Sequence, residues 1–69
     1  MQNYIVRLGE EMIHLGGEPS TIENFRIIPV KASNQYRAIE KAAKKVIKAY
    51  HISPLVLRVV MISEDRTLI

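Results

Sequence analysis

Five basic residues recur at helical spacing in the second half of the chain, within the segment RAIEKAAKKVIKAY. They form a basic row that consists of Arg37, Lys41, Lys44, Lys45 and Lys48. Steps of three and four residues place such side chains along one side of a helix. Cations on successive turns can follow the phosphates of a nucleic acid, meet an acidic protein, or serve as the solvated side of a core helix. The row lacks Asn and Gln to read bases and aromatic rings to stack on them, so nucleic-acid binding there would depend mainly on charge.

The remaining polar residues do not form a pattern that supports catalysis or metal binding. The two histidines, His14 and His51, are far apart, and the chain has no cysteine. No paired carboxylates, nucleophile elbow or phosphate-cradling glycine loop can be recognised. His51 follows the predicted helix, where a cation is favourable and a capping role is expected. We therefore expect no enzymatic activity, no cofactor and no metal.

Size and composition predict one small soluble domain that spans residues 1–69. The net charge is +3, and 48% of the residues are hydrophobic. The longest apolar run, LVLRVVMI, is too short to cross a bilayer, and the start MQNYIVRLGEEM lacks the features of a signal peptide. These features favour a cytoplasmic location, and the absence of cysteine is compatible with it. Because so small a core gives marginal stability, self-association would be a useful source of further burial.

The residue pattern predicts two strands, a helix and a third strand. The strands are expected over residues 3–8, 25–32 and 55–62, and the helix over residues 34–50 with Ser33 as its N-cap. Pro29 cannot donate to a strand ladder, so the second strand should lie at a sheet edge. A right-handed crossover then gives the strand order 2-1-3. The expected fold is α+β, a ββαβ chain whose three-stranded, mainly antiparallel sheet carries one helix on one face.

Helical periodicity also predicts which side of the helix packs on the sheet. The expected core positions are Tyr36, Ile39, Ala43, Val46, Ile47 and Tyr50. Alternation along the strands leaves the opposite sheet face largely apolar as well, which is unusual for an antiparallel sheet that faces water. The candidate partner-binding residues on that face are Phe25, Ile27, Val56, Arg58, Val60 and Ile62. The loop GGEPSTI, the C-terminal residues, a second copy of the chain, a partner protein or a nucleic acid are the alternatives for covering it.

The order of the segments YIVRL, FRIIPVKASNQYRAIEKAAKKV and LVLRVVMI resembles that of several very small phage-encoded proteins. Those proteins use a minimal domain of one sheet and one helix to bind a host or defence component. The resemblance implies a non-catalytic inhibitor that occludes a surface of a larger machine in the host-cell cytoplasm. It implies no individual functional residue, because such proteins share no common binding motif.

Two functions follow as hypotheses. The first is a protein-interaction module that uses the uncovered sheet face, either toward a partner protein or as a homodimer. The alternative is a nucleic-acid-binding domain that uses the basic row of the helix. No membrane association is expected under either hypothesis.

Overall fold

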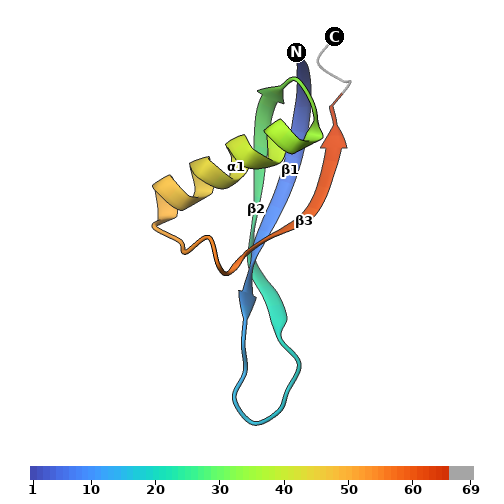
Figure 1. The fold of residues 1–69 in the computed structure, drawn as a ribbon. Helices are drawn as coiled ribbons and strands as arrows, with labels where there is room; N and C mark the ends of the chain where they lie inside the picture. Colours follow the sequence, from blue (N-terminus) through green and yellow to red (C-terminus); the bar gives the residue numbers. More distant parts are fainter. Residues whose placement is uncertain (66–69) are drawn as a thin grey trace.

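The computed structural model describes residues 1–65 and contains three strands and one helix. They follow the order β1 (Gln2–Met12), β2 (Thr21–Ala32), α1 (Gln35–Tyr50) and β3 (Leu57–Glu64). Strand β1 lies between β2 and β3 and pairs antiparallel with both (Figure 1). The predicted ββαβ fold and the strand order 2-1-3 are therefore confirmed, with the proline-containing strand β2 at an edge.

The hairpin formed by β1 and β2 is longer than the sequence predicts, and its far end extends beyond the helix and β3 as an arm (Figure 1). Polar pairs support the arm, since the Ser20 hydroxyl donates to Glu11 at 3.1 Å and His14 Nε2 lies 2.9 Å from Thr21 Oγ1. Gly16 turns the tip with a φ of 97°. The loop GGEPSTI lies in this arm and does not fold back over the sheet.

The helix begins one residue later than predicted and has a different cap. Asn34, not Ser33, is the N-cap, and its side-chain oxygen accepts a hydrogen bond from the Arg37 amide at 2.9 Å. An asparagine cap satisfies one of the free amides in the first turn. The helix ends where His51 adopts a left-handed conformation with a φ of 56°. His51 therefore ends the helix through its backbone conformation. The chain then continues through Ser53 and Pro54 to β3.

One core forms between α1 and the sheet face beneath it, which we name the covered face. Its buried members are Tyr4, Val6, Leu8, Val30, Ala32, Ala38, Ala42 and Val46. The helix contributes two alanines and one valine, and it lies mainly over β1 and β2. Short alanine side chains let the helix backbone lie close to the strands.

The predicted helix face is therefore wrong by roughly a quarter of a turn, at 100° per residue. Val46 is buried as expected, but Tyr36 is 82% exposed and Tyr50 is 55% exposed. Ile39, Ala43 and Ile47 are partly buried along one side of the contact. The large side chains dominate the apolar pattern of the sequence, whereas the tight contact with the sheet selects the small ones.

Strand β3 contains a bulge that changes which of its residues face the helix. Arg7 pairs with Met61 and Leu8 pairs with Val59, so Val60 is an additional residue without a partner on β1. Ile62 pairs with Val6 and packs against the core. The prediction that Ile62 lies on the uncovered face is therefore wrong, because an inserted residue reverses the alternation on either side of it.

The helix in the described part of the chain is neither long enough nor apolar enough to cross a membrane.

Candidate functional site

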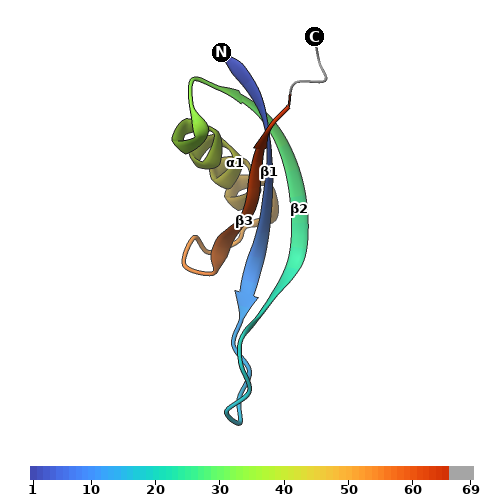
Figure 2. The ribbon, with the colours of Figure 1, turned by 90° about the vertical axis from the view of Figure 1, so that its right-hand side faces the viewer.

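The side of the sheet away from α1, which we name the open face, is bare along its length in residues 1–65 (Figure 2). Strand register defines its membership, since paired residues in an antiparallel ladder share a face. Its central residues are Ile5, Arg7, Gly9, Phe25, Ile27, Pro29 and Met61. Register places Asn3, Lys31 and Ser63 at one end of this face and Glu11, Ile22 and Arg58 at the other end. Phe25, Ile27 and Met61 are 48%, 64% and 54% exposed. Apolar side chains from both outer strands, β2 and β3, therefore meet solvent on one surface.

Arg7 lies at the centre of the open face, paired with Ile27 on one side and Met61 on the other. Its guanidinium carbon lies 4.7 Å from the centroid of the Phe25 ring, within the range of a cation–π interaction. Its Nε is buried and has no hydrogen-bond partner among the described residues. A charged group is thus held inside an apolar surface with one of its donors unsatisfied.

The other described arginines each reach a carboxylate. The pairs are Arg26 with Glu10 at 2.8 Å, Arg37 with Glu40 at 3.5 Å and Arg58 with Glu11 at 3.1 Å. Arg7 has no such pair within residues 1–65. The lack of a carboxylate partner therefore distinguishes Arg7 on the open face from the other described arginines.

Gly9 has no side chain and so leaves the space that Phe25 occupies beside Arg7. A Cβ at position 9 would overlap Ile22 Cγ2 and would lie 3.2 Å from the Phe25 ring. Opposite Gly9, strand β2 contains an extra residue, and Asn24 takes a left-handed φ of 55°. Only glycine leaves room for these two side chains to lie over β1. The bulge thus presents an aromatic ring on the open face.

Arg58 and Val56, two of the predicted contact residues, lie where the arm leaves the sheet. The Arg58 guanidinium donates to the Leu55 carbonyl at 2.8 Å, to the Leu57 carbonyl at 2.9 Å and to Glu11 at 3.1 Å. Val56 precedes β3, and its carbonyl accepts a hydrogen bond from the Glu11 amide at 2.8 Å. These contacts join the arm to the start of β3, so Arg58 has a structural role at the margin of the open face.

The structure therefore brings together only some of the predicted contact residues. Phe25, Ile27 and Arg58 lie on the open face as predicted. Ile62 is on the covered face and Val60 is at the bulge. Met61 lies on the open face, where strict alternation predicts Val60 and Ile62. No turn residue or proline marks the bulge, so the sequence holds no signal that could have corrected the assignment.

The basic row of α1 is exposed, and three of its five members have contacts within the chain. Arg37 and Lys44 lie on either side of Glu40, at 3.5 Å and 3.8 Å from its carboxylate oxygens. The Lys41 ammonium donates to the Lys31 carbonyl at 2.7 Å, which joins the helix to β2. Exposed pairs of this kind contribute little to stability. They do leave fewer cations free to meet phosphates than the sequence suggests.

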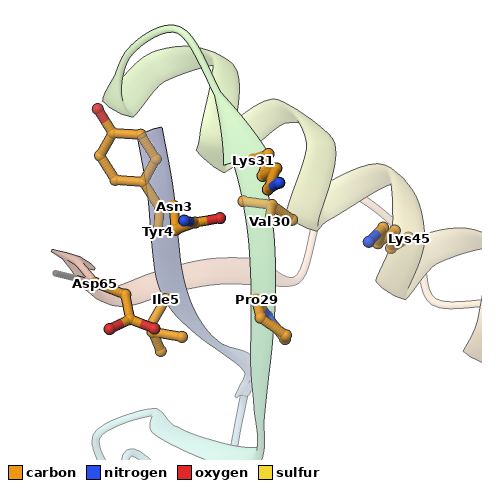
Figure 3. Close-up of a pocket in the computed structure, with 8 residues that line it drawn as sticks. All are labelled: Asn3, Tyr4, Ile5, Pro29, Val30, Lys31, Lys45 and Asp65. Carbon is orange, nitrogen blue, oxygen red and sulfur yellow. The ribbon is translucent and has the colours of Figure 1, made fainter. Parts of the chain in front are cut away.

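A shallow cavity of about 190 Å³ is lined by residues of β1, β2 and α1 and by Asp65 (Figure 3). Its lining consists of Asn3, Tyr4, Ile5, Pro29, Val30, Lys31, Lys45 and Asp65. Sites for drug-sized ligands usually measure about 300–1,000 Å³. The lining also mixes residues from both faces of the sheet. We therefore do not regard this cavity as a small-molecule site.

Neither histidine belongs to a cluster of potential metal ligands. Among residues 1–65, no group of three or more His, Asp or Glu side chains is placed to hold a metal ion. His14 lies in the arm beside Thr21 and Glu23, and His51 ends the helix. Comparisons with known protein families, with curated proteins and with solved structures found no match to this chain.

Proposed function

We propose that this chain is a small non-catalytic module that binds another protein through the open face. One observation carries the proposal: the sheet buries one apolar face under α1 and leaves a second apolar face in solvent, with Phe25, Ile27 and Met61 about half exposed. Antiparallel sheets with one solvated face normally place polar residues there. A contiguous apolar surface on a soluble domain is typical of an interaction site.

Energetics support a protein surface as the occupant. Burial of apolar area contributes roughly 25 cal/mol per Å², so covering this face would add a favourable term that the free chain lacks. A flat sheet face suits another protein better than it suits a small molecule, which prefers a concave pocket. The resemblance in element order to very small phage-encoded proteins gives the proposal a more specific form, in which the open face occludes a host or defence protein.

The basic row supports nucleic-acid binding as the alternative. Lys45 and Lys48 are exposed, and no ion pair of theirs occurs within residues 1–65. Against this alternative, Lys41 is used to join the helix to β2, and Glu40 places a negative charge in the row between Arg37 and Lys44. We therefore place the protein-interaction function first.

The test uses a charged substitution on each side of the sheet. Ile27→Asp places a carboxylate on the open face, and Tyr36→Asp is the control at another exposed apolar position, on α1. Both variants should fold, which circular dichroism can check. Affinity capture from the cells that make the protein should recover a protein partner with the wild type and with Tyr36→Asp, and sedimentation at micromolar concentration should show the complex that this partner forms. Ile27→Asp should lose it.

Two results would contradict the proposal. One is capture and sedimentation that Ile27→Asp leaves unchanged. The other is retention of nucleic acid by the wild type that is sensitive to salt and is abolished by Lys41→Ala with Lys44→Ala. That second result would favour the basic row as the functional surface.

A further inference from the structure

We infer that the partner of the open face presents an Asp or Glu carboxylate set among apolar side chains, and that Arg7 is the residue that receives it. The inference rests on the proposed function and specifies the chemistry of the partner. It begins from the central position of Arg7, between Ile27 and Met61, and from its buried and unpaired Nε.

The covered face contains a completed version of the same arrangement. There Arg26 lies over the Tyr50 ring, with its guanidinium carbon 4.1 Å from the ring centroid, and it also donates to Glu10 at 2.8 Å. Arg7 lies over Phe25 in a similar way on the open face, but no carboxylate reaches it from residues 1–65. The two sites share an arginine and an aromatic ring and differ in the acid. A carboxylate from outside the chain would complete the second site.

The surroundings of Arg7 favour a carboxylate within an apolar segment over a free anion. Ile5, Ile27, Phe25 and Met61 border the guanidinium, so a docked apolar surface would exclude water from around it. Removal of water strengthens a charge-assisted hydrogen bond and makes an uncompensated charge costly. The site therefore selects a partner that supplies both the apolar contact and the negative charge.

Charge argues against a second copy of this chain as the occupant. A two-fold axis through the centre of the open face would bring Arg7 toward its own counterpart. Glu11, which lies at one end of the open face, is already paired with Arg58 at 3.1 Å. A symmetric dimer centred on this patch would bury two cations together, which is unfavourable. The occupant is therefore a different protein that carries an acidic residue.

Selection from a random library of 12-residue displayed peptides tests the inference directly. The full chain is presented in parallel as wild type, Arg7→Met and Arg37→Met. Methionine retains the length and apolar character of the arginine stem without the guanidinium. Arg37 is the matched control because it is an exposed arginine on the opposite side of the molecule. Peptides selected on the wild type and on Arg37→Met should be enriched in Asp or Glu flanked by apolar residues, and those selected on Arg7→Met should lack this acidic enrichment.

A double-mutant cycle then checks that the acid and Arg7 meet. The best peptide should bind Arg7→Met at least tenfold more weakly than the wild type, and its Glu→Gln form should lose a similar factor on the wild type. The same Glu→Gln change should have little effect on Arg7→Met, because the interaction is already absent. Arg7→Lys serves as a second variant that retains the charge, and it should restore part of the binding.

The outcomes separate this inference from the proposed function. Apolar peptides without acidic enrichment, or equal losses with Arg7→Met and Arg37→Met, would overturn the inference while binding that Ile27→Asp abolishes still supports the open face. Peptides that bind Ile27→Asp as well as the wild type, or no enrichment of any peptide on the wild type, would overturn the proposed function itself.

Discussion

The covered face and the open face of the sheet differ little in residue type and greatly in burial. On the covered face, Tyr4, Val6 and Leu8 of β1 are almost fully buried under α1. On the open face, Ile27 and Met61, which flank the same strand, remain more than half exposed. Apolar character alone therefore does not define a core here. The position of the single helix decides which face stabilises the fold and which is left to meet a partner.

The two faces also treat charge differently. Each holds one arginine over an aromatic ring, but only Arg26 on the covered face has its carboxylate, Glu10. The covered face is thus electrostatically complete within the chain, whereas the open face has an unmatched donor at its centre. Exposed apolar side chains and an unsatisfied buried donor are both unfavourable in a free monomer, and here they occur together on one surface. This combination is typical of binding sites.

The largest expected contrast between the faces comes from shortening one apolar side chain on each. Leu8→Ala removes a fully buried side chain and should lower the free energy of unfolding by about 2–5 kcal/mol. A domain of this size has only about 3–5 kcal/mol to lose, so the variant should be largely unfolded at 37 °C. Urea denaturation followed by circular dichroism measures the change.

Met61→Ala is the control on the open face, where half of the side chain is already in water. It should change the free energy of unfolding by less than about 1 kcal/mol. Equal losses for the two variants would mean that the open face is buried in the free protein, and the comparison between the faces would fail.

The sequence was sufficient for the fold but not for the detailed faces. Chain order, crossover handedness and Pro29 led to the strand order 2-1-3, because these constraints act on whole elements. Alternation gives the correct face of β3 up to Val59 and the wrong face for Met61 and Ile62, since the bulge at Val60 depends on how two strands twist together. The length of the arm is underestimated because its strands contain Glu and other polar residues, some of which pair across the hairpin.

The helix face shows a different limit of sequence reasoning. Periodicity weighted by hydrophobicity favours tyrosine and isoleucine, and alanine scores weakly. The close contact between helix and sheet instead buries Ala38 and Ala42 completely. The candidate site is therefore only partly predictable from the sequence. Alternation places Phe25 and Ile27 correctly on the open face. The position of Met61 follows only from the strand register, and the unpaired Nε of Arg7 follows only from the contacts.

A smaller contrast tests what allows α1 to cover its face of the sheet. Ala42→Leu forces extra volume into the fully buried contact and should lower the free energy of unfolding by about 1–3 kcal/mol. Ala49→Leu makes the same change at an exposed helix position and should have an effect within about 0.5 kcal/mol. Thermal melts of both variants measure the difference. A larger loss for Ala49→Leu would mean that the helix packs through another side.

The smallest expected effects on stability come from replacing the two stacked arginines. The two replacements should change the free energy of unfolding in different directions on the two faces. Arg7→Met removes a buried unsatisfied donor, whose cost is about 1–3 kcal/mol, and also a cation–π contact worth about 0.5–1 kcal/mol. The free energy of unfolding should therefore stay unchanged or rise by up to about 2 kcal/mol. Arg26→Met loses both its ring contact and its ion pair with Glu10, which is itself largely buried, and should lower stability by about 1–2 kcal/mol.

Urea denaturation of the two variants beside the wild type measures both changes under one condition. Because the substitutions are chemically identical and both arginines lie over rings, a difference in sign isolates the carboxylate that Arg26 has and Arg7 lacks. A loss of stability in Arg7→Met as large as that in Arg26→Met would show that Arg7 is already satisfied in the free protein. The open face would then have no unmet charge for a partner to supply, and its arginine would be as structural as the one beneath the helix.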